Sequence, residues 1–272
     1  CHVVGKDIIR FHCVIWPAML MALGEALPQS VFAHGFLTVR NPQTGNAEKM
    51  SKSRGNAIAP AEVIDKLGVE GYRYYFMTDV THGEDSAISF ERMEQVYNAD
   101  LANSWGNLVS RTITMCDKYF DGKTPVVDDK WKQQTSPLRD IAQRMFEPYQ
   151  KNMESMNFAA AKDVVTELVH AANHYIEDMA PWNVAKDPTR AEELRFILLN
   201  LLESIRIAAH LLAPFMPETS HEVLMREGLD PEAELVGGTM IEGLSLDVIC
   251  AWGGLAGDQP VVKGAALFPR LA

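Results

Sequence analysis

A change of pattern along the 272-residue chain constrains its fold more than any other feature. Before residue 60, apolar runs of strand type flank one helical pattern, giving strand, helix and strand over about 40 residues, as in an α/β crossover unit. From Ser89 onward the apolar residues recur almost entirely at the 3.6-residue helical period. We therefore predict an α/β segment followed by an all-α antiparallel bundle.

The α/β segment has a recognisable order of elements. Residues 2–4 form a short apolar run that we predict to be a buried strand. Apolar spacing predicts a helix over Lys6–Leu23, kinked or restarted at Pro17. Residues 31–39 are rich in β-branched and aromatic side chains, which predicts a strand with a glycine break. The turn-forming residues 41–48 predict an exposed loop.

The second part of the chain reads as helices joined by short loops. A short helix is predicted at Ala61–Leu67 with a stop at Gly68, followed by an apolar and aromatic piece at Tyr72–Val80. Thr189 and Glu192 have the spacing of a capping box at a helix start. The five long helices that the periodicity predicts cover Met93–Phe120, Ser136–Met153, Asn157–Met179, Thr189–Ala213 and Pro217–Glu227.

Charge and cysteine usage exclude several classes of protein. The net charge is −11, but residues 1–56 carry six basic and three acidic side chains, so an anionic ligand should bind there. The acidic remainder argues against non-specific nucleic-acid binding, and we expect no DNA partner. No apolar run approaches the ~20 residues of a membrane span, and we expect a cytoplasmic protein. A zinc signature is not expected from four cysteines this far apart, namely Cys1, Cys13, Cys116 and Cys250.

Lys49–Asn56, which reads KMSKSRGN, carries the clearest chemical signal. Flexible lysines separated by small hydroxyl residues suit a moving polyphosphate, because an ammonium is a point charge with three donors. Serine hydroxyls and loop N–H groups add neutral donors. A generic K-x-x-K loop would more often be a solvated basic turn. The pentapeptide KMSKS, however, would occur by chance in a chain this long on the order of once in ten thousand times.

A KMSKS segment between an α/β unit and a helical bundle resembles the class I aminoacyl-tRNA synthetases. Across essentially the whole chain, further motifs resemble the methionyl-tRNA synthetases: residues 2–8, 11–12, 16–18, 32–35, 101–103, 106–108 with Arg111, and 180–182. The family's upstream HIGH-type motif, first half-fold and zinc-bearing insertion are missing, and the loop before KMSKS is longer than in many relatives. We therefore expect a C-terminal fragment that is inactive by itself.

The resemblance implies four regions and one activity. Residues 1–36 would be the C-terminal part of a Rossmann-type catalytic domain, and 37–103 the KMSKS and stem-contact region. Residues 104–235 would form an anticodon-binding bundle, and 236–272 an irregular tail packing on the bundle or the catalytic domain. The implied reaction attaches methionine to tRNA(Met) through methionyl-adenylate, using ATP with Mg²⁺ and no zinc site within this chain. It needs positioning and charge neutralisation rather than a protein nucleophile. The alternatives are a leucine-type or cysteine-type class I enzyme, or a non-catalytic helical tRNA-binding module.

Catalytic and ATP-binding roles follow from the same resemblance. Lys49 and Lys52 would act in catalysis by stabilising charge on the departing pyrophosphate. Asp7 could be simply an acid at a helix start, stabilised by the helix dipole. The resemblance favours a carboxylate that accepts from the ribose hydroxyls. ATP would be held by Gly5, Asp7, His34, Leu37, Lys52 and Ser53.

A pocket for methionine is implied in the crossover helix. Ile8, His12 and Trp16 are spaced i, i+4, i+8 and would share one helix face. Such a stripe is usually core. The resemblance instead has these three residues line the methionine side-chain pocket, where an aromatic ring contacts the polarizable thioether.

Anticodon contacts are implied in the bundle. Asn107 and Arg111 are one helical turn apart, and Trp182 follows Pro181 at the end of another helix. A surface pair and a buried tryptophan would explain the same residues. By resemblance the three contact the anticodon, through hydrogen bonds to base edges and stacking on the indole.

Overall fold

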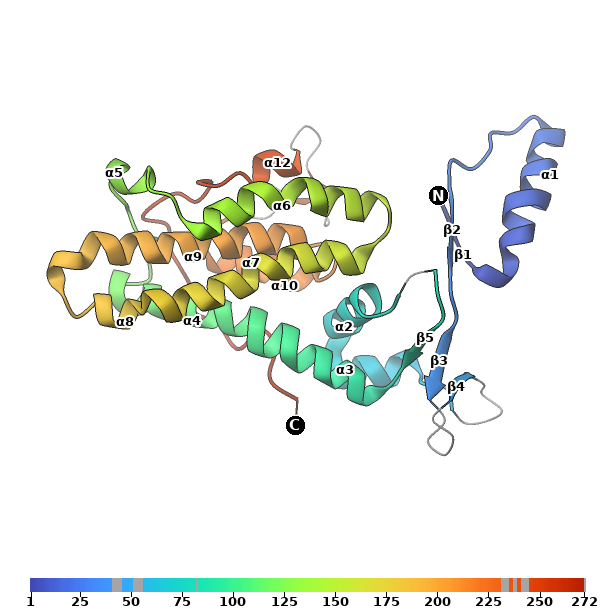
Figure 1. Cartoon of the computed structure of the whole chain (residues 1–272), viewed down its shortest axis with the longest axis horizontal. Helices are drawn as coiled ribbons and strands as arrows, with labels where there is room; N and C mark the ends of the chain where they lie inside the picture. The colour runs from blue at the N-terminus through green and yellow to red at the C-terminus, as the bar shows by residue number, and fades with distance from the viewer. Residues whose placement is uncertain are drawn as a thin grey trace.

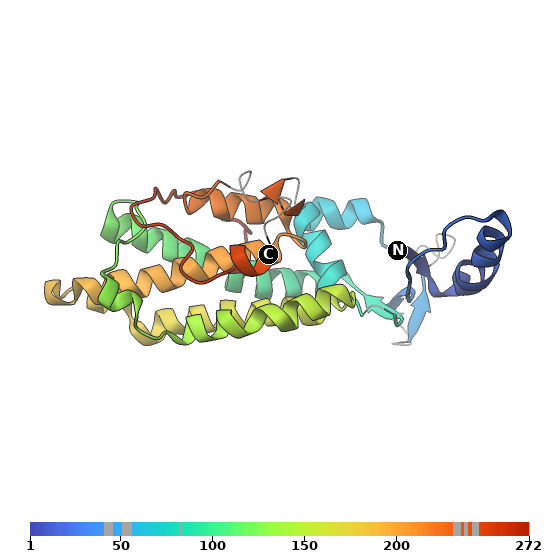
Figure 2. The ribbon, with the colours of Figure 1, turned by 90° about the horizontal axis from the view of Figure 1, so that it is seen from above.

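The molecule is elongated, with an α/β arm at one end and a long helical bundle at the other (Figures 1 and 2). The computed structural model describes residues 1–40, 46–50, 56–81, 83–230, 235–236, 239–240 and 245–271. The order of elements confirms the predicted fold class, an α/β segment followed by helices.

The arm begins with two parallel strands. β1 (His2–Gly5) pairs with β2 (Val31–His34), and the helical crossover connects them. The predicted first strand is present but only half buried, since Val4 is 7% exposed and Val3 65%. Because the strands are parallel, Gly5 and His34 end at the same edge of the sheet.

The crossover is helical throughout but is not one regular helix. Pro17 is the second residue of the final α-helix, so the proline lies where the π-helical turn changes to α-helix. Gly24, at φ 74°, ends this helix in the left-handed region. The segment consists of a 3₁₀ turn, a π-helical turn and an α-helix: η1 (Lys6–Ile8), η2 (Phe11–Ile15) and α1 (Trp16–Leu23). The helix predicted over Lys6–Leu23 is therefore present as three successive helical types and not as one regular α-helix.

A second sheet follows directly. β3 (Leu37–Arg40) lies between β4 (Ala47–Lys49), which is antiparallel to it, and β5 (Ser86–Ile88), which is parallel. The single strand predicted over 31–39 thus forms two strands in different sheets. Gly35 permits the change, since an added Cβ there would collide with the carbonyl of Glu84. The loop predicted over 41–48 extends too far, because 47–48 belong to β4; residues 41–45 lie outside the described part.

Helix α2 (Pro60–Thr78) combines two pieces that the sequence predicted separately. Gly68 has φ 74° and ψ 168°, a non-helical conformation essentially restricted to glycine, so α2 consists of two helical pieces that meet at a kink. The first piece ends at Gly68 as predicted, and most of the apolar piece at 72–80 belongs to the second.

Two side chains of α2 fix this helix to the bundle. The Glu70 carboxylate accepts hydrogen bonds from the N–H groups of Glu218 (2.9 Å) and Thr219 (2.7 Å). The guanidinium of Arg73 donates to the carbonyl of Pro214 at 2.8 Å. The KMSKS side of the molecule is thereby connected rigidly to the helical part.

The bundle is built around α9 (Ala191–Leu212), in which every residue from Asn200 to Leu212 is buried. The predicted helices are found within three residues at each end, although the first contains a π-helical stretch. The predicted capping box before α9 was wrong, because the side chain of Asp187, not Thr189, accepts the N-terminal hydrogen bond. The other bundle elements are α3 (Phe90–Val96), η4 (Tyr97–Gly106), α4 (Asn107–Phe120), α6 (Pro137–Glu154), α7 (Phe158–Met179) and α10 (Pro217–Arg226).

The C-terminal segment, residues 245–271, packs along the bundle. Arg206 is 3% exposed and donates to the carbonyl groups of Ile249 and Ala251. Glu203 is 1% exposed, pairs with Arg206 at 2.8 Å and accepts the N–H of Leu255. The remaining short elements are α5 (Asp129–Lys132), α8 (Pro181–Val184), η5 (Pro188–Arg190), β6 (Leu235–Val236), β7 (Thr239–Met240) and α12 (Leu246–Ile249).

Candidate functional site

The carboxyl ends of β1 and β2 bring Gly5, Asp7 and His34 together. A Cβ added to Gly5 would lie 2.7 Å from a carboxylate oxygen of Asp7 and 3.9 Å from the His34 ring. Asp7 and His34 are both exposed, and His34 Nδ1 lies 2.9 Å from the carbonyl oxygen of Gly35. In open α/β sheets, ligands bind beyond the carboxyl ends of parallel strands. This edge therefore has the position and polarity of a nucleotide site.

The ring of Phe36 lies between two ammonium groups. Lys6 Nζ is 5.1 Å and Lys49 Nζ 4.8 Å from the ring centroid, and both distances are within the range of a cation–π contact. Lys49 is placed here by the pairing of β4 with β3, which sets it opposite Thr38. The contact holds the first lysine of KMSKS near the strand ends, whereas Lys52 and Ser53 lie outside the described residues.

Asp85 connects this cluster to the loop before β5. Its carboxylate pairs with Lys6 at 2.6 Å and accepts the N–H of Phe36 at 2.7 Å. These two bonds, the one from Lys6 first, hold the pKa of Asp85 below its usual range. Sequence reasoning missed Asp85 and Phe36, because Asp85 is separated from Phe36 by 49 positions and no short motif includes both.

A cavity of about 630 Å³ opens beside the cluster. His34, Leu37 and Lys49 line it from the arm, and Met156 and Phe158 from the start of α7. Two residues predicted to bind ATP, His34 and Leu37, therefore share one cavity with Lys49, which was predicted to act in catalysis. Gly5 and Asp7 are not among its lining residues and stand at the neighbouring strand edge.

A second cavity, of about 330 Å³, lies against the crossover helices. His12 and Trp16 line it together with His2, Phe11, Ile15 and Met19. Trp16 is 39% exposed, so this face is not a sealed core. The irregular turns direct Ile8 elsewhere: it does not line the cavity, but its carbonyl oxygen lies 3.1 Å from His12 Nδ1. Of the three residues predicted to bind methionine, two, His12 and Trp16, line this cavity.

Arg111 and Trp182 meet at the far end of the bundle. The Arg111 guanidinium lies 5.9 Å from the Trp182 ring and pairs with Glu177 at 2.7 Å. Trp182 is 37% exposed, so its indole is accessible to a partner. Asn107 is the first residue of α4, one turn before Arg111, and is partly exposed. Sequence reasoning missed Glu177, which holds Arg111 in place.

The turn between α7 and α8 presents the indole. Ala180 has φ 41° and ψ 60°, a left-handed conformation that ends α7, and Pro181 begins α8 in the next position. The N–H of Asn183 closes the turn on the carbonyl of Ala180 at 2.7 Å. Trp182 thus stands on a short rigid helix and not on a flexible loop.

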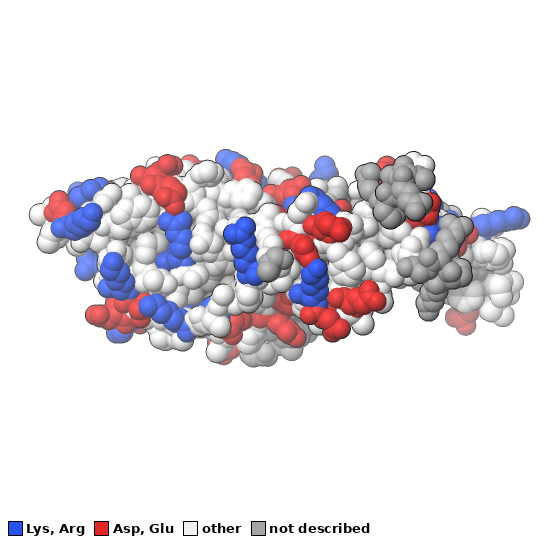
Figure 3. All heavy atoms as spheres, turned by 90° about the horizontal axis from the view of Figure 1, so that it is seen from below, with Lys and Arg blue, Asp and Glu red and all other residues white. Residues whose placement is uncertain are grey.

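The face of the molecule drawn in Figure 3 shows no continuous basic patch among the described residues. On the face drawn in Figure 3, basic and acidic side chains alternate along the length of the bundle. Such a face favours a few specific contacts over non-specific binding. Within the described ranges, no three His, Cys, Asp or Glu side chains come together as metal ligands, and no helix is long and apolar enough to cross a bilayer.

Comparison with known proteins assigns the two parts of the chain separately. Residues 1–113 match the family described as tRNA synthetases class I (M), and residues 125–234 match the anticodon binding domain of methionyl tRNA ligase. By these two matches, the α/β part and the helical bundle are those of a class I aminoacyl-tRNA synthetase.

Individual relatives narrow the assignment. Methionine–tRNA ligase of Bacillus subtilis is 40% identical over 270 residues, which are 99% of this chain and 38% of the relative. That of Caldanaerobacter subterraneus is 39% identical over 270 residues, and the chain covers 40% of it. The structure of Mycobacterium tuberculosis methionyl-tRNA synthetase in complex with methionyl-adenylate superimposes with a TM-score of 0.84 at 31% identity, over 99% of this chain and 50% of that one. The chain belongs to the methionyl-tRNA synthetase family, and it spans about two fifths of the length of these curated relatives.

Proposed function

We propose that this chain contributes to the ATP-dependent attachment of methionine to tRNA(Met), as part of a full-length methionine–tRNA ligase. The observation that carries the proposal is that the KMSKS lysine, Lys49, lies at a nucleotide-type strand edge, while Arg111 and Trp182 form an exposed pair at the far end of the bundle. The bundle spans the distance between them (Figure 1). This arrangement suits chemistry at one end and anticodon reading at the other. We include a cytoplasmic location in the proposal, because tRNA charging serves translation.

ATP would bind at the strand edge and the adjoining cavity. The Asp7 carboxylate is placed to accept hydrogen bonds from ribose hydroxyls, with Gly5 allowing close approach and His34 and Leu37 beside the base. Lys49, with Lys52 and Ser53 of the same motif, would hold the phosphates and stabilise the charge on departing pyrophosphate. Mg²⁺ would accompany the phosphates and offset part of their charge.

Methionine would bind against the crossover helices. The side-chain cavity offers the Trp16 ring and the His12 imidazole, and a thioether makes favourable contacts with aromatic rings. Ile8 would act through its carbonyl oxygen, 3.1 Å from His12 Nδ1, and not as part of the wall. A pocket of this kind selects by shape, so a missing methylene would cost only about 1–3 kcal/mol of binding.

The tRNA anticodon would bind at Asn107, Arg111 and Trp182. Unpaired bases stack on exposed aromatic rings, and arginine and asparagine pair with base edges. Arg111 and Glu177 are partly exposed, at 31% and 58%, so their pairing contributes about 0–1 kcal/mol and is readily exchanged for a base.

The test separates charging from activation in a full-length ligase that carries this sequence. Trp182→Ala removes a stacking surface worth about 1–3 kcal/mol per base, so kcat/KM for tRNA charging should fall roughly 5- to 150-fold. Methionine-dependent ATP–pyrophosphate exchange should not change. Arg111→Gln should behave in the same way.

Arg144→Gln is the matched control, since Arg144 is also a helix-surface arginine paired with a glutamate, Glu167. It should affect neither reaction. Equal losses of charging and exchange in Trp182→Ala would show that the tryptophan is structural and would overturn its role in anticodon reading.

A further inference from the structure

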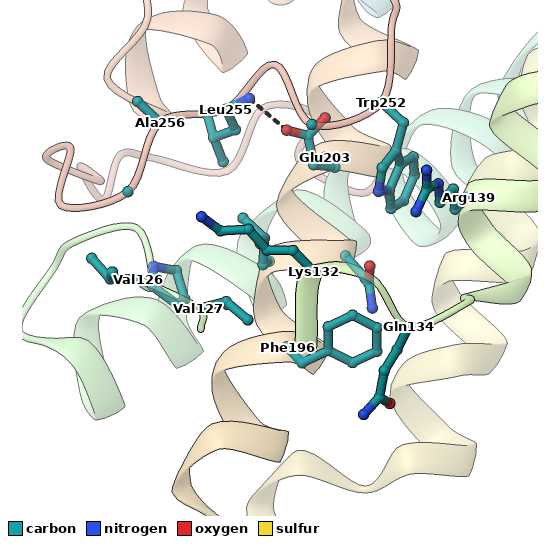
Figure 4. Close-up of a pocket in the computed structure, with 15 residues that line it drawn as sticks. Val126, Val127, Lys132, Gln134, Arg139, Phe196, Glu203, Trp252, Leu255 and Ala256 are labelled. Atoms are coloured by element: carbon teal, nitrogen blue, oxygen red, sulfur yellow. Dashed lines mark hydrogen bonds between the residues drawn. The ribbon is translucent and has the colours of Figure 1, made fainter. Parts of the chain in front are cut away.

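A pocket of about 330 Å³ lies in the bundle, and none of its lining residues belongs to the proposed ATP, methionine or anticodon sites. Its walls come from the α4–α5 connection, the start of α6, the first half of α9 and the C-terminal segment (Figure 4). A volume near the lower end of the about 300–1,000 Å³ typical of ligand pockets suits a single group of small-molecule size.

Two aromatic side chains, Phe196 and Trp252, form part of the wall. Phe196 projects from α9, and its ring lies 5.5 Å from that of Trp131, which supports it from outside the pocket. Trp252 projects from the C-terminal segment and is partly buried. Its position is fixed, because the preceding carbonyl, that of Ala251, accepts a 2.6 Å hydrogen bond from buried Arg206. A flat ring system would find a preformed stacking surface here.

The polar lining is basic in balance. Arg139 is partly buried, stands beside Trp252 in Figure 4, and has no hydrogen bond or ion pair with any described residue. Lys132 lies between Phe196 and Glu203, and its only described ion pair is an exposed one to Asp129 at 3.2 Å. Glu203 is not a free acid, since its carboxylate is held by Arg206 and the N–H of Leu255.

Amide side chains complete the polar lining of the pocket. Asn200 is 2% exposed and lines the pocket, with its Nδ2 3.3 Å from the hydroxyl of Tyr175. Gln134 adds a second amide at the exposed rim. Amide groups both donate and accept, as the edges of a nucleobase require.

We propose that this pocket binds one nucleotide, with the base at the aromatic walls and the phosphate at Arg139 and Lys132. In a chain of net charge −11, a pocket whose arginine lacks an internal partner is suited to an anionic ligand. The ligand can be a free nucleoside monophosphate or one nucleotide of an unpaired RNA loop, since both present the same chemistry.

The first experiment is calorimetric titration of the chain with 5′-AMP, adenosine and ribose 5-phosphate. AMP should bind at least about fivefold more tightly than either part alone, because the base and the phosphate are each recognised. Arg139→Gln, which removes a charge-assisted bond, should weaken AMP binding about tenfold. Trp252→Leu should weaken it about as much, and Arg144→Gln on the same helix should leave it unchanged.

The two ligand sources are separated by competition with a hairpin RNA that has a seven-nucleotide loop. Displacement of AMP by the hairpin assigns the pocket to an RNA nucleotide, and AMP binding without displacement assigns it to a free nucleotide. In either case, Arg139→Gln must also weaken AMP binding for the proposal to hold.

Three results would overturn the proposal. They are no AMP binding at concentrations up to about 10 mM, which would place the dissociation constant beyond the millimolar range, equal binding by Arg139→Gln and the unchanged chain, or ribose 5-phosphate binding as tightly as AMP. If Trp252→Leu does not fold, the Arg139→Gln variant still decides. The anticodon variants Trp182→Ala and Arg111→Gln should not change AMP binding, so failure here is distinct from failure of the proposed function.

Discussion

The buried pair of Glu203 and Arg206 should determine whether the C-terminal segment stays on the bundle. Their side chains are 1% and 4% exposed, and they are joined by bonds of 2.8 and 3.2 Å. Arg206 also donates to two carbonyl groups of the segment, and Glu203 accepts the N–H of Leu255. The Glu203 carboxylate thus neutralises the buried Arg206 guanidinium and also accepts the backbone N–H of Leu255 in the C-terminal segment.

Glu203→Ala leaves the Arg206 guanidinium buried without its counter-charge. Breaking a buried pair in this way costs about 3–5 kcal/mol, a large fraction of the 5–15 kcal/mol stability of a typical domain. There is little room for relaxation, because a Cβ added to Gly254 would lie 2.8 Å from the guanidinium carbon. We therefore expect a loss of about 3–5 kcal/mol in the free energy of unfolding.

The assay is urea-induced unfolding followed by circular dichroism, with the slope of the transition compared between variants. Glu167→Ala is the control, because the Arg144–Glu167 pair is 62% and 54% exposed and should contribute about 0–1 kcal/mol. Hydrogen exchange should show faster exchange of the Leu255 amide in Glu203→Ala. A loss below about 1 kcal/mol, equal to that of the control, would refute the reasoning.

Three other predictions concern single positions. Phe36→Leu removes the ring that Lys49 contacts, so pyrophosphate exchange by a full-length ligase should slow several-fold with little change in KM for methionine; an unchanged kcat would contradict this role. Gly68→Ala should lower stability by about 1–3 kcal/mol in urea unfolding, because φ 74° with ψ 168° strains any other residue; a neutral effect would contradict the backbone argument. Glu227 is fully buried with neither carboxylate oxygen hydrogen-bonded to a described residue, and burial raises its pKa well above 4.5. The folded state therefore holds a proton that the unfolded state releases above pH 4.5, so stability falls as pH rises above this value. Glu227→Gln should be more stable than the unchanged chain at pH 7 and equal to it near pH 4, and the same difference at both pH values would disprove this.

The helices could be predicted from the sequence because their apolar residues face one core. The five long segments after Ser89 keep the 3.6-residue period over several turns, and the structure places their ends within three residues of the prediction. The predictions were wrong where tertiary contacts override local pattern. The single strand predicted over 31–39 is two strands, because β2 pairs with β1 whereas β3 pairs with β4 and β5 in a second sheet.

The site was only partly predictable for a similar reason. Short motifs pointed to Lys49, Arg111 and Trp182, and two of these three residues do meet in space. Their supporting partners, Asp85 and Glu177, come from distant parts of the chain and belong to no motif. Helical spacing grouped Ile8, His12 and Trp16 but did not indicate the 3₁₀ and π turns of the crossover, and only His12 and Trp16 line the cavity.

We propose that this chain is part of an enzyme that activates methionine. The most direct test is ATP–pyrophosphate exchange by a full-length ligase that carries this sequence, with methionine, leucine and cysteine as separate substrates. We expect methionine to support exchange far better than the other two. Exchange driven equally well by leucine or cysteine, or none with methionine, would contradict it.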